Sequence, residues 1–147
     1  MSDIADIRAA SRRLVRELGF MRPTLAGTDL SPSAVHALVE IGARGSLTAA
    51  ELCEVLLLEK SSVSRLLAKL SAAGEIVARP SETDARARPV SMTPKGRATL
   101  ARIDRFAERQ VSAALVRMEP ASRRALAGAL GAYAAALAQG RMEDGDG

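Results

Sequence analysis

The sequence predicts a mainly α-helical fold with one small β-hairpin, an α+β arrangement in a single domain-sized chain. Apolar residues make up 48% of the 147 residues and aromatic residues only 2%, which favours helices packed through aliphatic side chains. Apolar side chains recur at helical spacing through most of the chain. Two short runs between residues 75 and 92, rich in β-branched residues, flank a polar loop and predict the hairpin.

The segment from Thr48 to Gly96 organises the rest of the chain. Thr48 followed by Glu51 is a capping box, in which the hydroxyl accepts from the backbone of the third helical residue and the carboxylate reaches back to the cap N–H. It predicts a helix start at residue 48. The apolar face of this helix carries Leu52, Val55 and Leu56.

A second helix follows, and its two faces differ in chemistry. The i, i+3, i+4, i+7 rule places one set of residues on a buried face: Val63, Leu66, Leu67 and Leu70. The opposite face is small, polar and basic: Ser61, Arg65 and Ala68, flanked by Ser64 and Lys69. Small residues allow a helix to sit deep in a DNA major groove, and the arginine fork fits guanine bidentately.

Gly74 is expected to end this helix in the left-handed conformation. Residues 75–79 and 88–92 then predict two antiparallel strands, joined by a charged loop over residues 80–87. Pro89 lacks a backbone donor and indicates an edge position. A helix-turn-helix followed by such a hairpin is a winged helix.

Three motifs in this order resemble the MarR family of bacterial transcriptional regulators. They are Lys60-Ser61-Ser62-Val63-Ser64-Arg65-Leu66 in the second helix, Asp84-Ala85-Arg86 in the wing, and Met92-Thr93-Pro94-Lys95-Gly96 after it, where Met92 replaces the usual leucine. The resemblance implies a homodimer that binds a near-palindromic double-stranded DNA operator, most often as a repressor. In many family members a small-molecule effector binds between the DNA-binding lobe and the dimer helices.

The DNA-binding residues expected from these patterns are Lys60, Ser61, Ser62, Ser64, Arg65, Lys69, Arg79, Arg86 and Arg88. The resemblance implies that Arg86 enters the minor groove, where negative potential attracts arginine. Asp84 is expected to structure the wing by pairing with Arg65 or Arg88. The alternative for all these residues is an ordinary solvated surface.

The charge distribution favours a DNA partner over the solvated-surface alternative. Residues 60–102 contain nine basic and three acidic side chains, a net charge of +6, although the whole chain carries only +4. The remaining residues carry −2. Positive charge therefore gathers on the segment that would meet a polyanion.

Helices are expected on both sides of the winged helix (residues 30–93). A coiled-coil-like seam predicts the first over residues 3–25, within an N-terminal dimerisation segment of residues 1–29. Ser31 with Pro32 predicts the next helix start, with a break at residues 42–45. Residues 94–140 supply the C-terminal dimerisation helices, the last from Pro120 to Gly140, and residues 141–147 are expected to form a disordered acidic tail.

Other classes of function find little support. The single cysteine, Cys53, reads as a structural thiol in a reducing cytoplasm, and one histidine, His36, is too few for a zinc site. No catalytic motif, cofactor-binding loop, signal peptide or membrane-length apolar run is present. We therefore expect no enzyme activity, no cofactor, no metal and no membrane association.

Two alternatives to the regulator stay open. A winged helix can become a protein-interaction module without specific DNA binding, which loss of the basic face would mark. A small helical enzyme, or the regulatory half of a fused enzyme, is the other; from the length of the chain we expect no catalytic domain after the winged helix. Effector-lining residues are not evident from spacing, and Arg16, His36 and Glu40 are candidates only by position in the expected helices.

Overall fold

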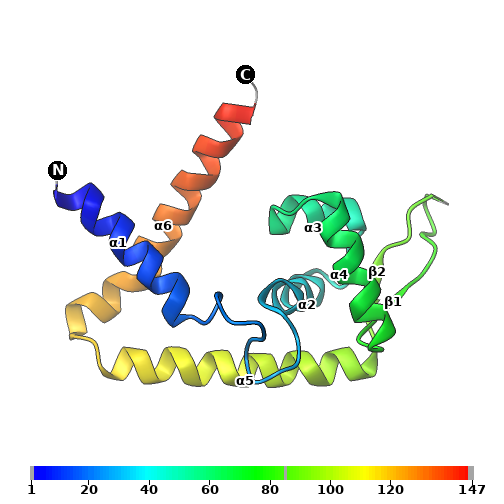
Figure 1. The fold of residues 1–147 in the computed structure, drawn as a ribbon, viewed down its shortest axis with the longest axis horizontal. Helices are drawn as coiled ribbons and strands as arrows, with labels where there is room; N and C mark the ends of the chain where they lie inside the picture. The colour runs from blue at the N-terminus through cyan, green and yellow to red at the C-terminus, as the bar shows by residue number, and fades with distance from the viewer. Residues whose placement is uncertain (1, 85, 146–147) are drawn as a thin grey trace. The chain divides into compact units, whose positions relative to one another are not determined.

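The computed structural model describes residues 2–84 and 86–145 and divides the chain into two compact units, Met1–Ala107 and Glu108–Gly147. The described elements follow one another as six helices and two strands (Figure 1). They are α1 (Ser2–Glu17), α2 (Pro32–Arg44), α3 (Ala49–Leu56), α4 (Lys60–Ala72), β1 (Ile76–Ala78), β2 (Val90–Met92), α5 (Pro94–Val116) and α6 (Pro120–Gly145). The mainly helical fold with a small hairpin is confirmed.

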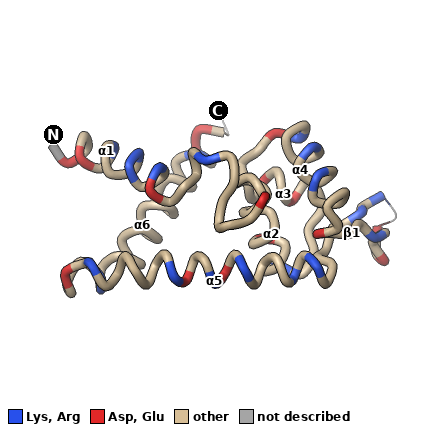
Figure 2. The backbone as a smooth tube through the Cα atoms, turned by 60° about the horizontal axis from the view of Figure 1, so that its bottom comes forward, with Lys and Arg blue, Asp and Glu red and all other residues tan. Residues whose placement is uncertain are grey.

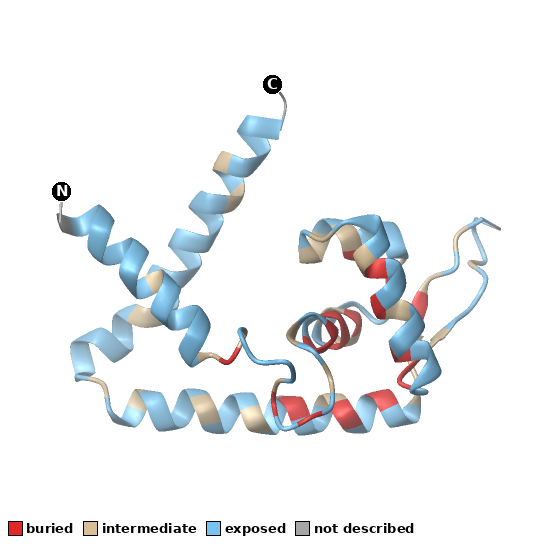
Figure 3. Cartoon of the chain, viewed as in Figure 1, coloured by how far each residue is buried: buried red, intermediate tan, exposed pale blue. Residues whose placement is uncertain are grey.

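The core of the first unit joins α2, α3, α4 and the hairpin. Its largest fully buried side chains are Leu38, Ile41, Leu47, Leu52, Val63 and Leu70. Figure 3 shows that buried residues gather in α2, in α4 and in the first half of α5, whereas α1 and α6 are exposed along most of their length. Three helices closed by a hairpin are the winged helix that the sequence predicted.

Strand β1 pairs antiparallel with β2 in the register Ile76↔Met92, Val77↔Ser91 and Ala78↔Val90. The strands are shorter than the expected residues 75–79 and 88–92, although Arg79 still donates its backbone N–H to Pro89 O at 3.1 Å. Leu47 adds a single-residue bridge on the other side of Val90. This bridge ties the chain between α2 and α3 to the wing, and the sequence patterns did not predict it.

The predicted helix starts at Ser31 and Thr48 are confirmed. Ser31 Oγ accepts from the backbone N–H of Ala34 at 3.2 Å, and Pro32 is the first residue of α2. At α3 both halves of the capping box are present: Glu51 N–H donates to Thr48 Oγ1 at 3.2 Å, and Thr48 N–H donates to Glu51 Oε1 at 3.0 Å.

The predicted first helix over residues 3–25 is too long, because α1 ends at Glu17. Gly19 adopts a φ of +90°, which no α-helix continues through. Thr28 then organises the following loop: its hydroxyl donates to Leu25 O at 2.7 Å and accepts from Leu30 N–H at 3.1 Å. The prediction failed because Leu18 and Leu25 keep helical spacing although they lie in a loop, where they are half-buried. Apolar spacing alone does not distinguish such a loop from a helix.

Of two other predicted helix boundaries, the break at residues 42–45 is confirmed at its last residue, and the end of the last helix at Gly140 is wrong. Helix α2 continues through Gly42, where a Cβ would overlap the Leu100 side chain of α5, so this glycine permits close packing rather than a break. Gly45, with a φ of +83°, is the actual C-cap. Gly140 does not end α6, which runs to Gly145, because a single glycine costs a helix only about 1 kcal/mol. Residues 141–145 of the expected disordered tail are therefore helical, and the last two lie outside the described residues.

Candidate nucleic-acid interface

Helix α4 presents the polar face that the sequence predicted. Its anchoring side chains Val63, Leu66 and Leu70 are buried. Ser61, Ser64, Arg65 and Lys69 are exposed, with Lys60 at the helix start, and Ser62 is half-buried beside them. Glu59 precedes the helix without making a side-chain cap, which leaves backbone donors at this end open to an anion. The recognition face is defined here as Lys60, Ser61, Ser62, Ser64, Arg65 and Lys69.

A shallow hollow of about 260 Å³ adjoins the recognition face. It is lined by Ser62, Arg65 and Lys69 of α4 and, from the start of α2, by Ser31 and Ser33. The sequence identified Ser31 as a helix cap but did not associate either serine with this face. Only the packing of α2 against α4 brings them together, so no local pattern could have found them.

The wing is organised by side chains that hold its own backbone. Ser81 Oγ accepts from the backbone N–H groups of Thr83 and Asp84, each at 3.2 Å. Asp84 Oδ1 accepts from Arg86 N–H at 3.0 Å. The expected pairing of Asp84 with Arg65 or Arg88 is not present. Arg86 follows Asp84 by only two residues, so a local turn brings its backbone N–H within hydrogen-bonding distance of the Asp84 carboxylate. This local hydrogen bond replaces the expected ion pair with a distant arginine.

Arg79, Arg86 and Arg88 of the wing are all exposed. Figure 2 shows basic residues along α4 and in the wing loop. The ion pairs found within residues 2–84 and 86–145 are Arg13 with Glu17 and Arg44 with Glu40, each along one helix. The positive charge of the recognition face and of the wing is thus not neutralised by an ion pair within that part of the chain.

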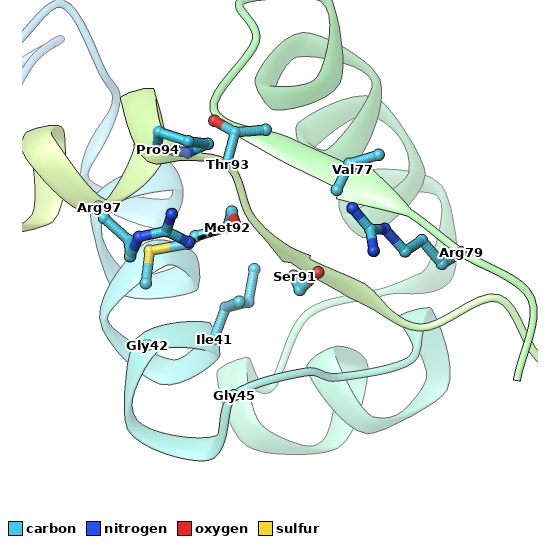
Figure 4. Close-up of a pocket in the computed structure, with 10 residues that line it drawn as sticks. All are labelled: Ile41, Gly42, Gly45, Val77, Arg79, Ser91, Met92, Thr93, Pro94 and Arg97. Carbon is cyan, nitrogen blue, oxygen red and sulfur yellow. Dashed lines mark hydrogen bonds between the residues drawn. The ribbon is translucent and has the colours of Figure 1, made fainter.

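A larger hollow of about 720 Å³ lies at the root of the wing (Figure 4). Arg79 of the wing and Arg97 of α5 approach it from opposite sides, and Ile41 and Met92 lie between them. The remaining lining residues are Gly42, Gly45, Val77, Ser91, Thr93 and Pro94, so no carboxylate lines this hollow. An apolar floor between two guanidinium groups suits a small molecule that carries a carboxylate.

The effector candidates suggested by position lie elsewhere. His36 packs its ring edge-on against Phe20, with centroids 5.0 Å apart, and Glu40 pairs with Arg44. Arg16 lies in the last turn of α1. None of the three lines either of the hollows described above. Sequence position could not tell which helices, or which face of α2, border a cavity.

The described residues form neither a cluster of metal ligands nor a helix that could span a membrane. Over residues 2–84 and 86–145, no three His, Cys, Asp or Glu side chains cluster closely enough to hold a metal ion. Cys53 is half-buried and packs against the core. A bilayer-spanning helix is likewise absent from this range.

A sequence model described as the MarR family matches residues 28–87. No curated protein matches the sequence. Among solved structures, Streptococcus pneumoniae FabT in complex with DNA is 22% identical with a TM-score of 0.76, over 94% of this chain and 97% of that one. A mutant of E. coli MarR complexed with operator DNA is 18% identical with a TM-score of 0.72, over 90% and 95%.

A third similar structure is Bordetella bronchiseptica BpsR, studied for the regulation of its DNA binding by 6-hydroxynicotinic acid. It is 20% identical with a TM-score of 0.71, over 88% of this chain and 98% of that one. At these identities the structures establish a shared fold. The family match covers the helix-turn-helix and most of the wing, and it confirms the resemblance seen in the sequence motifs: residues 28–87 of this chain match the MarR family.

Proposed function

We propose that the protein is a homodimeric transcriptional regulator that binds a specific DNA sequence and acts as a repressor. The observation that carries this proposal is the division of α4 into an anchored face and an exposed recognition face. Val63, Leu66 and Leu70 fix the helix to the core, while Arg65 and its neighbouring serines face solvent. An α-helix fits the major groove, where base edges can be told apart.

Each basic group has a distinct expected role on the DNA. Arg65, in the middle of the exposed face, is the base-reading residue, and Lys60 and Lys69 contact phosphates. Arg86 enters the minor groove, with Arg79 and Arg88 on the flanking backbone. Asp84 supports Arg86 by holding its backbone N–H. The DNA complexes of the FabT and MarR structures support this use of the fold.

A second copy of the chain is the expected partner of the terminal helices. Helix α1 exposes Ile4 and Ile7, and α6 exposes Leu130, Tyr133 and Leu137, the last to 58%. Apolar stripes of this kind on long helices are typical of a helix–helix interface. Two-fold symmetry would then place two recognition helices about one DNA turn apart, so the operator should be near-palindromic.

The hollow at the wing root is the proposed effector site. The regulation of BpsR by 6-hydroxynicotinic acid, an aromatic acid, supports an acidic effector. Such a ligand shifts DNA binding only if it prefers one arrangement of the wing over another. Titrating the protein with 6-hydroxynicotinic acid should shift the NMR amide signals of Ser91, Met92 and Arg97 first. Shifts confined to His36 and Glu40 would place the site between the helices instead.

The test of DNA recognition is selection from a pool of randomised duplex DNA at two salt concentrations. Recovery of an inverted repeat, with affinity falling steeply as salt rises, is the expected outcome. Weak binding without a preferred sequence would refute specific regulation and favour the protein-interaction module. Sedimentation of the protein alone measures its oligomeric state separately.

A further inference from the structure

The first turn of α5 holds the end of the recognition helix. Lys95 Nζ donates to Ala73 O, at the C-cap of α4, over 2.5 Å. The Thr93 hydroxyl donates to the next two carbonyls, Gly74 O at 2.5 Å and Glu75 O at 3.2 Å. Thr93 N–H also donates to Glu75 O at 3.1 Å. A single short segment, Thr93–Lys95, therefore binds three consecutive carbonyl groups that follow α4.

The positive charge of Lys95 stabilises the end of α4 rather than the start of α5, the helix to which Lys95 belongs. Lys95 is the second residue of α5, and a cation in the first turn opposes the helix dipole. Its ammonium group instead lies at the C-terminal end of α4, where the free carbonyls carry partial negative charge. The Thr93 hydroxyl has a second use, because it accepts from Gly96 N–H at 3.1 Å and so caps α5.

The backbones are too close at this joint for much relative movement. Gly96 lies directly against Glu75 O, where a Cβ atom would overlap that oxygen. Gly74, with a φ of +75°, turns the chain from α4 toward β1, and the Lys95 Cδ would lie 3.8 Å from a Cβ placed there. The opposite end of α4 has no side-chain cap. Apart from the packing of its buried face, α4 is therefore held by this joint, the contacts of Thr93, Lys95 and Gly96 with the backbone of residues 73–75.

We propose that Thr93 and Lys95 are positioning residues that set the angle at which the recognition helix and the wing meet DNA. They contact no base. They hold the end of α4 in one orientation against α5, and with it strand β1, which follows after three intervening residues. This proposal rests on the proposed DNA recognition, and it adds that sequence preference depends on a joint remote from Arg65.

The DNA test compares Lys95→Met, which keeps the aliphatic stem but removes the charge, with Lys69→Met on the recognition face. Lys95→Met should lower affinity for the selected duplex roughly fivefold. It should leave affinity for random duplex and the salt dependence unchanged, because Lys95 neutralises no phosphate. Lys95→Arg should restore binding. Lys69→Met should instead weaken both duplexes and reduce the salt slope by about one.

Two results would overturn the proposal. If Lys95→Met weakens both duplexes alike with a smaller salt slope, Lys95 is a phosphate contact. If it changes neither duplex, the joint does not orient α4. Thermal unfolding of the variant, expected near that of the wild type, separates misorientation from loss of fold.

A measurement without DNA tests the positioning role of Thr93 and Lys95 separately from the proposed DNA recognition. The N–H groups of Ala73, Gly74 and Glu75 donate to Lys69 O, Ser71 O and Leu70 O, each at 3.0 Å. In Lys95→Met their hydrogen exchange should accelerate by about threefold or more, whereas amides of Leu38 and Ile41 in α2 should not change. Unchanged exchange at all three would refute the joint even if the wild type selects an operator. Accelerated exchange in a protein that selects none would refute only DNA recognition.

Discussion

Gly96, in the first turn of α5, lies directly against the backbone carbonyl oxygen of Glu75, the residue before β1. Gly96 is itself buried, and Met92 Cβ would be 3.3 Å from an added Cβ. The neighbour is backbone, held by Thr93 N–H, so it cannot rotate away as a side chain would. The contact makes glycine necessary at the position where the sequence motif ends.

Gly96→Ala should therefore lower the free energy of unfolding, by about 2 to 3 kcal/mol, because an added methyl group must displace the hairpin. Urea denaturation measures it. The matched control is Gly128→Ala in α6, where nothing lies within 4 Å of the added carbon. Gly128 is two residues away from both Leu126 and Leu130, so it lies on the side of α6 opposite these apolar residues. The control should gain about 0.5 to 1 kcal/mol. Equal effects of the two substitutions would refute the close contact.

The capping box of α3 should make stability depend on pH. The hydrogen bond from the Thr48 backbone lowers the pKa of Glu51 below its ordinary value of 4.5, helped by the Thr48 side chain and the charge of Arg44. A carboxylate whose pKa is lowered by folding stabilises the protein above its unfolded pKa. This stabilisation is lost as pH falls through the folded pKa.

Glu51→Gln removes that charge, so its midpoint of urea denaturation should lie below that of the wild type at about pH 7 and converge with it at about pH 3. Glu54→Gln on the same helix is the control and should stay parallel to the wild type. A constant difference between Glu51→Gln and the wild type over this range would show that the carboxylate charge plays no part.

Leu57 closes α3 in the left-handed conformation, with a φ of +55°, and its side chain is exposed to 60%. A side chain with a Cβ is strained there, and little burial offsets the strain. Leu57→Gly should thus stabilise the protein by about 0.5 to 1 kcal/mol, measured by thermal unfolding. Met21→Gly, at an exposed position without a positive φ, should not stabilise it. A loss of stability in Leu57→Gly would contradict this prediction, because it would mean that the packing of the Leu57 side chain stabilises the protein more than the backbone strain destabilises it.

Signals carried within a few residues predicted much of this fold. The capping box at Thr48, the Ser31–Pro32 start and the glycine turn at Gly74 each depend on neighbours three or four positions away. The two faces of α4 followed from helical periodicity for the same reason. The exposed face of α4 and its buried anchors were therefore predictable, including Arg65 and Lys69.

Features made by tertiary contact were not predictable. The bridge of Leu47 to Val90 involves one residue, with no strand pattern. The end of α1 at Glu17 was missed because Leu18 and Leu25 continue the apolar spacing into a loop. Ser33 lines the hollow beside the recognition face only because α2 packs against α4. Arg79 and Arg97 line the hollow at the wing root from separate elements. Pairing of Asp84 was mispredicted because a nearer backbone donor competes for it.

The central claim is that α4 reads DNA sequence through its exposed face, and Arg65 tests it most directly. The measurement compares wild type, Arg65→Ala and the control Arg105→Ala, an exposed arginine of α5, on a selected duplex and on a random duplex of equal length. Arg65→Ala should cost about 1 to 3 kcal/mol on the selected duplex, far less on the random one, and Arg105→Ala little on either. Equal losses on both duplexes for Arg65→Ala would contradict sequence reading by this helix.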